Sequence, residues 1–471
     1  TILGSYFLVL SVVTWRSRRR NAKMRTSIPA RSAAVGRLIA RSASRKMWLR
    51  LRQVVASRKR RTALKQAYQI KTSEEAAALM GQMKGVFMKL GQVASFAQPS
   101  LPKAAQKALA ALQQDAPPMS FELARGVIEA ELGGVLSDHF RDVDEVPLAS
   151  ASIGQVHRAR LKDGTEVVLK VQYPGVADAI RSDLQFTHGI MSLFGGLFPN
   201  TDNKAMVGEV KARLLEEVDY RQELRNQLRF GEIWRGHPLI RIPAVFPEFS
   251  GERVLCQSYA RGLSFYDFIA VANETEKQLA VCVLNDFVFD SMHLHSVFNG
   301  DPHPGNYLFH EDGGITFLDF GCVKRFEGTF LADVRALNRA IVDHDRDGFE
   351  MLIRRLKIIL PGRKMDADFV WDFFQYHAEP FAEDRVFSFT PEYLARAGDV
   401  MKLSNLRKLN LPPDLVFFNR ITFGLNAIFE RLGAEANFHR WYRRYIDLST
   451  EHPPALARVG VELEARFLTT Q

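Results

Sequence analysis

The spacing of hydrophobic and polar positions changes twice along this chain. From Thr72 to about Leu132 apolar residues recur at helical spacing, and Ser73 precedes two glutamates in the manner of an N-cap. Residues 146–258 instead carry short alternating or β-branched runs around a single stretch of helical periodicity. We expect strands at residues 146–148, 155–161, 166–172, 242–246 and 253–258, and one long helix at residues 204–230.

Two tight turns support the strand assignments. Lys162-Asp163-Gly164 predicts a hairpin between the second and third strands, because Asp-Gly adopts the conformations that short hairpin turns need. Asp312-Gly313-Gly314 predicts a small hairpin between apolar runs at residues 307–309 and 315–318. Apart from this hairpin, the pattern after Gly262 is mostly helical to the end of the chain. The sequence therefore predicts an α+β fold in which a strand-rich lobe precedes a mostly helical one.

Composition agrees with a folded chain of several packed parts. The 471 residues are 46% hydrophobic and 25% charged, as in globular proteins too long for a single core. The three cysteines are widely spaced and form no C-x-x-C pair, so we expect neither a disulfide framework nor a zinc site. The predicted parts are a basic N-terminal arm at residues 1–72, a helical extension at 73–144, the strand-rich lobe at 145–262 and the helical lobe at 263–471.

The net charge of +10 is concentrated in the N-terminal arm. Nineteen lysines and arginines precede Glu74, the first acidic residue, whereas acidic residues outnumber basic ones in the remainder. Few aromatic residues are interleaved with these charges, so the arm offers no stacking platform for bases and we expect no nucleic-acid partner. Residues 28–55 have the composition of an amphipathic helix, which favours contact with anionic membrane lipid. A solvated extension is the alternative.

An apolar segment opens the arm. Ile2–Trp15 is shorter than the roughly 20 residues that span a bilayer, although the arginines that follow it suit the cytoplasmic flank of an anchor. The chain starts at Thr1, so a clipped membrane anchor and a translation start at Met24 both remain open. We expect a cytoplasmic protein, peripheral at the inner face of the membrane, with a single N-terminal anchor as the alternative.

The most specific chemical signal lies in the helical lobe. Gly300-Asp301-Pro302-His303-Pro304-Gly305-Asn306 is followed thirteen residues later by Asp319-Phe320-Gly321. Phosphoryl transfer requires a carboxylate near the acceptor and oxygen ligands for Mg²⁺. We expect Asp301 in the catalytic loop and Asn306 and Asp319 as metal ligands, because the intervening hairpin has the length to bring them together. This set predicts a bilobal protein-kinase-like fold with ATP and Mg²⁺ as cofactors.

The strand-rich lobe supplies the remaining kinase elements. Lys170 lies in an apolar strand, where its ammonium group needs partners such as phosphate oxygens and Glu223 of the long helix. The loop before that strand has small residues and one glycine in place of a glycine-rich loop. Residues expected to contact the nucleotide are Ala149, Ser150, Ala151, Ser152, Ile153 and Gly154 in this loop, and Ser258, Tyr259 and Ala260 after the last strand.

Several motifs together resemble the UbiB (ADCK-type) family of atypical kinases associated with ubiquinone biosynthesis. Residues 148–157 look like its alanine-rich loop, Lys89-Leu90-Gly91-Gln92 matches its K-x-G-Q signature, and Glu217-Val218-Asp219 matches its E-x-D signature. The resemblance is dense over about residues 75–330 and weaker to about residue 440, where Leu411-Pro412-Pro413 is a family-like marker.

The resemblance implies a regulatory role for the helical extension. Lys89, Gly91 and Gln92 would lie on a helix that folds over the active site, and Glu217 and Asp219 would contact that extension. Because the extension occupies the space of a peptide substrate, the resemblance implies ATPase or lipid-linked activity in prenylquinone metabolism rather than protein phosphorylation. Quinone-biosynthesis proteins or precursors are the partners that it suggests.

Two features depart from the family pattern. Asn299-Gly300-Asp301 stands where family members often have H-A-D, but Asp301 is retained, so we expect little change in the chemistry. Residues 453–471 are too charged and too few to form the paired C-terminal membrane helices of some bacterial relatives. The N-terminal arm is therefore the remaining candidate for membrane contact.

Two other functions remain open on the sequence. Small-molecule kinases of the aminoglycoside or choline type share the catalytic-loop pattern, although they lack the K-x-G-Q signature. A non-catalytic scaffold switched by nucleotide would fit the loss of loop glycines. An ordinary protein kinase is the weakest alternative, because no A-P-E segment follows Gly321 at a suitable distance.

Overall fold

The structure is a computed structural model that describes residues 119–150, 153–184, 200–362, 366–400, 405, 408–410 and 412–447. All of them belong to one compact unit, Lys84–Gln471. The predictions for the basic arm, for the K-x-G-Q helix and for Ala151 and Ser152 lie outside the described residues.

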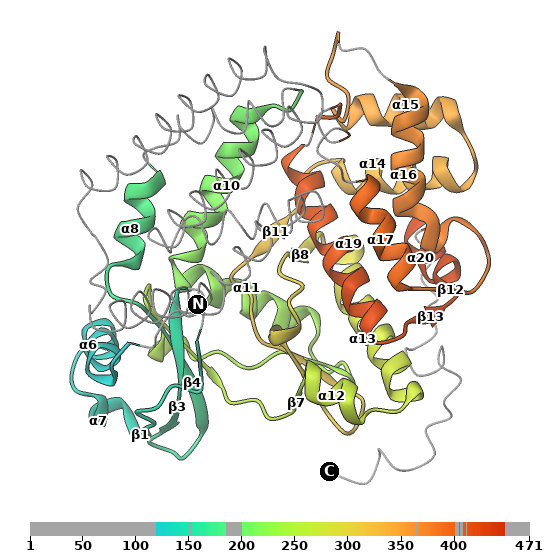
Figure 1. Cartoon of the computed structure of the whole chain (residues 1–471). Helices are drawn as coiled ribbons and strands as arrows, with labels where there is room; N and C mark the ends of the chain where they lie inside the picture. Colours follow the sequence, from blue (N-terminus) through green and yellow to red (C-terminus); the bar gives the residue numbers. More distant parts are fainter. Residues whose placement is uncertain are drawn as a thin grey trace, which may run out of the picture. The chain divides into compact units, whose positions relative to one another are not determined.

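An antiparallel sheet of five strands forms the first lobe (Figure 1). Its path runs β1 (Phe140–Val143), β3 (Gly154–Leu161), β4 (Glu166–Gln172) and β6 (Val254–Ser258), and β2 (Ala149–Ser150) pairs with β3. The predicted hairpin turn is confirmed: Gly164 has a φ of 91° and donates its N–H to the Leu161 carbonyl at 3.0 Å. A residue with a Cβ would be strained there.

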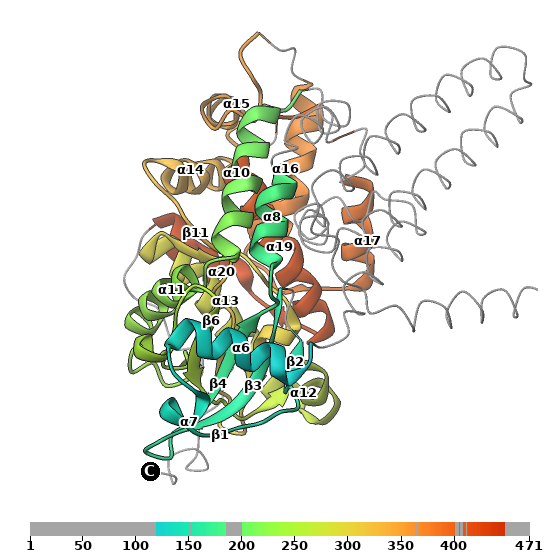
Figure 2. The ribbon, with the colours of Figure 1, turned by 90° about the vertical axis from the view of Figure 1, so that its left-hand side faces the viewer.

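The helix α6 (Phe121–Leu132) covers one face of this sheet (Figure 2). Its residues Ala124, Val127 and Ile128 pack in one buried cluster with Val167, Leu169 and Val171 of β4. Because side chains alternate along a strand, Lys170 lies on the opposite face of the sheet. One face of β4 therefore packs against α6, and the other face carries Lys170.

The expected strands at residues 146–148 and 242–246 are both wrong. The first region makes isolated hydrogen bonds to β3, such as that from the Leu148 N–H to the Val156 carbonyl at 2.7 Å, but forms no strand. The second region forms an isolated bridge between Val245 and Gln257. Pro147 and Pro243 supply no N–H to a neighbouring strand, which explains both interruptions. Two strands that were not expected, the short β2 and the earlier β1, complete the five-stranded sheet instead.

The single long helix is also wrong, because the chain breaks it in two. The helix α10 spans Asn203–Glu217 and α11 spans Tyr220–Ile233. Asp219 begins α11 as its N-cap, accepting the Arg221 N–H at 3.0 Å on its side chain. Gln172 of β4 donates to the Val218 carbonyl at 2.9 Å, so the break is stabilised from the sheet.

The second lobe is mostly helical, as expected. Its helices are α12 (Phe265–Val271), α13 (Glu274–His295), α14 (Phe330–Val342), α15 (Arg346–Arg355), α16 (Ala367–Ala382), α17 (Pro391–Val400), α19 (Pro413–Arg431) and α20 (Phe438–Asp447). The predicted small hairpin is confirmed as β9 (Tyr307–Phe309) and β10 (Ile315–Phe317). β8 (Val297–Asn299) pairs with β11 (Val323–Arg325).

The main core lies around α13, which a capping box of Asn273 and Glu276 begins. Its buried residues include Val283, Leu284 and Phe287, and Phe287 stacks on Phe317 of the small hairpin. The core thereby positions the segment that follows β10. In the part of the chain that the structure describes, no helix combines the length and the apolar character needed to cross a bilayer.

Candidate functional site: a buried lysine between two carboxylates

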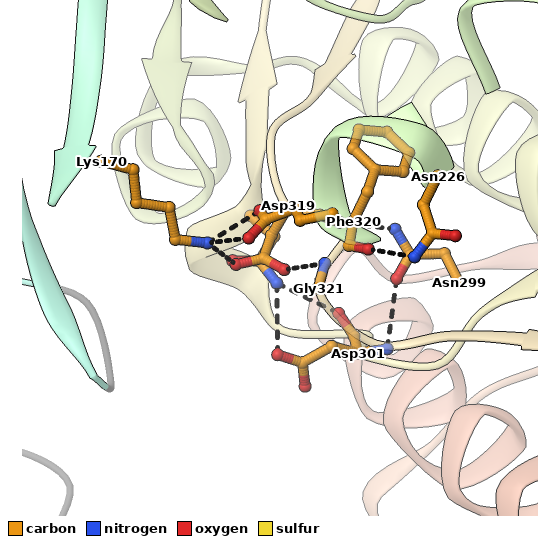
Figure 3. A network of polar contacts seen from close by, with 9 residues as sticks. Lys170, Asn226, Asn299, Asp301, Asp319, Phe320 and Gly321 are labelled. Atoms are coloured by element: carbon orange, nitrogen blue, oxygen red, sulfur yellow. Dashed lines mark hydrogen bonds and ion pairs between the residues drawn. The ribbon is translucent and has the colours of Figure 1, made fainter. Parts of the chain in front are cut away.

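Lys170 of β4 meets two carboxylates on the face of the sheet that α6 leaves uncovered. Its Nζ donates to Oε1 and Oε2 of Glu223 at 2.8 and 2.9 Å. The same Nζ donates to Oδ2 of Asp319 at 3.0 Å (Figure 3). The lysine side chain is 13% exposed and Glu223 is 3% exposed. The structure therefore brings together three residues that the sequence analysis named from separate motifs.

Each of the three comes from a different element. Lys170 is central in β4, Glu223 lies in the first turn of α11, and Asp319 follows β10. The N-cap at Asp219 fixes where α11 begins, and hence which residue of that helix faces Lys170. The break between α10 and α11 is thus part of the construction of the site.

The two carboxylates stabilise the charge of Lys170. Burial opposes the charge on Lys170, but Asp319 and Glu223 outweigh it and raise the pKa of the lysine well above its ordinary value. Burial raises the pKa of Glu223 to about 7 although Lys170 acts in the opposite direction. The ring of Tyr220 lies 5.3 Å from the Lys170 Nζ and adds a cation–π contact. A cation is therefore held at the face of the sheet.

The second predicted motif lies directly after β8. Asn306 closes a short 3-10 turn, η4 (Pro304–Asn306), and its Nδ2 donates to the Asp301 carbonyl at 3.2 Å. The same Nδ2 lies 3.5 Å from Oδ2 of Asp301, and the Nδ1 of His303 accepts the Gly305 N–H at 3.0 Å. The loop is thus held in one conformation by its own side chains.

Pairing of β8 with β11 brings the two motifs side by side. Gly300 donates its N–H to the Cys322 carbonyl at 2.7 Å, and a Cβ on Gly300 would lie 3.3 Å from both that oxygen and the Cys322 Sγ. The Leu318 N–H donates to the Asn306 carbonyl at 3.0 Å. The thirteen-residue spacing noted in the sequence corresponds to the hairpin of β9 and β10 that joins these segments.

The donor set suits Mg²⁺ better than a softer metal. Asp319 offers carboxylate oxygens and Asn306 an amide oxygen, the ligand types that Mg²⁺ takes together with phosphate oxygens and water. Among the described residues there is no group of three or more His, Cys, Asp or Glu side chains that could hold a metal by itself. A site of this kind depends on the phosphates to complete its coordination.

The predicted phosphate-binding loop is described in part. Ala149 and Ser150 form β2 opposite Val156 and Gln155, and both are exposed. Ile153 is buried and its carbonyl accepts the Tyr173 N–H at 2.9 Å. The Gly154 backbone lies so close to Val171 that an added Cβ would overlap the Val171 carbonyl. Glycine is therefore needed here for close strand packing rather than for a positive φ.

The predicted adenine segment follows β6. The Ser258 N–H donates to the Ala244 carbonyl at 2.8 Å and the Tyr259 N–H to the Glu166 carbonyl at 3.0 Å. These two donors are therefore already bonded within the protein. An adenine held through backbone donors would have to use Ala260 or later residues.

The two acidic residues predicted to contact the extension flank the break between the helices. Glu217 is the last residue of α10, and Asp219 caps α11. Their predicted partners Lys89, Gly91 and Gln92 lie outside the described residues. The cap gives Asp219 a local structural role whatever else it contacts.

Two amides that were assigned no role from the sequence also bond to the site. Asn226 of α11 donates from Nδ2 to the Phe320 carbonyl at 3.0 Å, and Asn299 of β8 donates to the Asp319 carbonyl at 2.8 Å. Asn226 lies three residues after Glu223 and therefore on the same face of the helix, which is the one signal that could have found it.

Comparisons with known proteins agree with this geometry. Residues 111–352 match the ABC1 atypical kinase-like domain. Atypical kinase COQ8B of Rattus norvegicus is 30% identical over 341 residues, 70% of this chain and 63% of that protein. Atypical kinase COQ8 of Saccharomyces cerevisiae is 26% identical over 369 residues, 77% of this chain and 74% of that protein.

Another relative, the uncharacterized protein sll1770 of Synechocystis, is 34% identical over 242 residues, which cover 50% of this chain and 41% of that protein. The chain thus spans less than two thirds of the length of sll1770 and of the rat relative. A solved structure of Rv3197 from Mycobacterium tuberculosis in complex with erythromycin has a TM-score of 0.60 and 28% identity. That match covers 83% of this chain and 98% of the other.

These matches confirm the kinase-like α+β fold and the resemblance to UbiB-type atypical kinases. The matched domain covers half of the chain and contains Lys170, Glu223, Asp301 and Asp319. The chain therefore belongs to the ABC1 atypical kinase-like family.

Proposed function

We propose that this protein binds ATP with Mg²⁺ and acts as an atypical kinase or ATPase. The observation that carries the proposal is the ammonium group of Lys170 held between Glu223 and Asp319, next to the loop of Asp301 and Asn306. A lysine placed by a helix carboxylate and a carboxylate that can hold metal are the parts that phosphoryl transfer needs.

Each residue has a definite task under this proposal. Lys170 would bind phosphate oxygens, and Glu223 would keep its ammonium group at that position. Asp319 and Asn306 would hold Mg²⁺, which when bound neutralises the charge that develops on the phosphates. Asp301 would orient the hydroxyl or water that accepts the phosphoryl group. Ser150, Ile153 and Gly154 would line the phosphate side of the nucleotide.

The proposed setting is prenylquinone or other lipid-linked metabolism at a membrane surface. The resemblance to UbiB-type kinases supports the pathway, and the basic residues that precede Glu74 support contact with anionic lipid. We propose a cytoplasmic protein, peripheral at the inner face of the membrane. The extension with Lys89, Gly91 and Gln92 would meet Glu217 and Asp219 and keep peptides out of the site.

The test is Mg²⁺-dependent nucleotide binding and ATP turnover of the wild type beside Asp319→Asn, with and without cardiolipin-containing vesicles. Asp312→Asn is the matched control, because Asp312 lies in the nearby hairpin turn and pairs with Arg241 outside the site. We expect Asp319→Asn to lose turnover and Asp312→Asn to keep it. A wild type without nucleotide binding under any of these conditions would refute the proposal.

A soluble small-molecule acceptor is the second candidate. It is favoured by the likeness to Rv3197, whose structure was solved with erythromycin. Turnover should therefore also be measured with erythromycin, an aminoglycoside, choline and a phenolic quinone precursor. Rapid phosphorylation of one soluble alcohol would favour a small-molecule kinase, and tight nucleotide binding without any turnover would favour the nucleotide-switched scaffold.

A further inference from the structure

Two asparagine side chains hold adjacent carbonyl groups of the Asp319 segment. The Nδ2 of Asn299 donates to the Asp319 carbonyl at 2.8 Å, and the Nδ2 of Asn226 donates to the Phe320 carbonyl at 3.0 Å (Figure 3). Asn226 is 3% exposed, so its amide is removed from water and the bond it makes is costly to lose.

The two amides come from elements that also carry the other site residues. Asn226 lies one turn after Glu223 on the same face of α11, so one helix holds both Lys170 and the Phe320 carbonyl. Asn299 ends β8, and its Oδ1 accepts the Asp301 N–H at 3.3 Å while its Nδ2 bonds to Asp319. Asn299 therefore connects the catalytic loop directly to the metal-binding segment.

These bonds act on a segment that contains a glycine. Gly321 follows Phe320 and has no Cβ to restrict its backbone, although its N–H donates to Oδ1 of Asp319 at 2.9 Å. The Phe320 ring is fully buried and packs 5.0 Å from that of Phe230. With both carbonyls fixed, the Asp319 carboxylate points to Lys170 and the Phe320 ring points into the core.

We propose that Asn226 and Asn299 are positioning residues that set the affinity of the site for metal-bound nucleotide. The inference rests on the proposed function and deepens it, since both Nδ2 groups donate to carbonyls of the segment that carries Asp319. The Asn299 amide, with a donor and an acceptor on one short side chain, bonds to both motifs at once.

The experiment uses the full chain with Mn²⁺ and a fluorescent ATP analogue as probes. For Asn226→Ala and Asn299→Ala we expect the Mn²⁺ concentration at half-maximal nucleotide binding to rise about 5- to 10-fold, the effect of one lost hydrogen bond. Nucleotide affinity without metal should change less than about 2-fold. The double variant should change by less than the product of the single variants, because both amides hold one segment.

Asn338→Ala is the matched control. Asn338 of α14 is 9% exposed, and its Nδ2 donates to the Tyr442 hydroxyl at 2.6 Å rather than to a residue of the site. It removes a comparable buried bond, so its metal dependence should equal that of the wild type. Asn299 is only half-buried, so Asn299→Ala carries the test if Asn226→Ala fails to fold.

Amide hydrogen exchange of the peptide containing residues 319–322 gives a second measurement that needs no ligand. We expect faster exchange in both asparagine variants and wild-type exchange in Asn338→Ala. Unchanged exchange together with wild-type metal dependence would overturn the inference and leave the proposed function standing. If the wild type binds no nucleotide, the proposed function fails, and exchange alone then decides whether the two amides hold the segment.

Discussion

At the scale of single residues, the site depends on the balance between one buried cation and two carboxylates. Lys170 has two carboxylate partners, whereas the charge of Glu223 is supported by Lys170 and by a backbone hydrogen bond at Phe320. Glu223 is also the most buried of the three, and burial raises its pKa to about 7. The charge of Glu223 therefore depends strongly on its partners, while Lys170 keeps its bond to Asp319 when the glutamate is neutral.

Replacing Glu223 tests this dependence. Glu223→Gln keeps the volume but not the charge, so we expect Lys170 to pair with Asp319 alone and to be displaced from the phosphate position. We expect kcat/KM for ATP turnover to fall about 10- to 100-fold, a loss of about 1.4–2.7 kcal/mol. Glu232→Gln on the same helix is the control, because its carboxylate is 60% exposed. Equal kcat/KM values for both variants would contradict the assigned role of Glu223.

The buried histidine near the end of α13 leads us to expect a loss of stability in acid. His293 of α13 is 6% exposed, and neither ring nitrogen has a hydrogen-bond partner in the described structure. Burial, helped by Arg335, lowers the pKa of His293 to about 3. An unfolded chain takes up this proton near pH 6.5. Between about pH 6.5 and pH 3 the unfolded state binds one more proton, so stability falls as the pH falls.

His293→Leu should remove this contribution. Within that window, each unit fall in pH should lower the free energy of unfolding of the wild type by up to about 1.4 kcal/mol more than that of the variant. Urea unfolding at pH 7.5, 6 and 5 measures it. Above pH 7 the difference between the two proteins should be constant, since His293 is neutral in both states. Identical slopes between pH 6 and 5 would show that the folded protein protonates His293.

At the scale of elements, the β3–β4 pair is the framework on which Lys170 is placed. The close packing of β3 on β4 at Gly154 fixes the register of Lys170, and the break before α11 fixes the position of Glu223 along its helix. A change of register in either element would move Lys170 or Glu223 out of contact.

Two glycine substitutions separate close packing from helix propensity. Gly154→Ala would place a Cβ against the Val171 carbonyl, and we expect a loss of about 1–3 kcal/mol in the free energy of unfolding. Gly126→Ala in α6 meets no atom within 4 Å and should stabilise by about 0.5–1 kcal/mol. Urea unfolding of the two variants gives both values. A stabilised Gly154→Ala would show that β3 can move away from β4 without cost.

The sequence predicted these elements where local chemistry decides them. The Asp163-Gly164 turn determines the β3–β4 hairpin, and the two motifs around Asp301 and Asp319 carry their own spacing. The predicted strand at residues 242–246 does not form because Pro243 interrupts pairing. The predicted long helix is broken because Asp219 is more favourable as an N-cap than in the interior of a helix. Spacing from Glu223 places Asn226 on the right face of the helix, but its acceptor is a carbonyl 94 residues away, which only the tertiary structure brings near.

At the scale of the whole described unit, charged residues join the two lobes. Lys324 of β11 lies 2.8 Å from Glu209 of α10 and 2.8 Å from Asp414 of α19. Arg213 of α10 donates to the Val323 carbonyl at 3.0 Å. Because α10 leads into α11, these contacts connect the helix that carries Glu223 to the segment that follows Asp319.

Replacing Lys324 tests this connection. Lys324→Met keeps the apolar stem but leaves Glu209 and Asp414 without their shared cation. All three side chains are partly exposed, so solvent reduces the effect, and we expect a loss of about 1–2 kcal/mol in the free energy of unfolding. Hydrogen exchange in α10 should become faster in the same variant.

Removing the two carboxylates as well distinguishes charge from packing. If repulsion between Glu209 and Asp414 causes the loss, then Lys324→Met combined with Glu209→Gln and Asp414→Asn should recover part of the stability. Lys277→Met is the control, because its partner Glu274 is 78% exposed and such pairs contribute little. An equal loss in the single and triple variants would mean that the lysine stem, rather than its charge, joins the lobes.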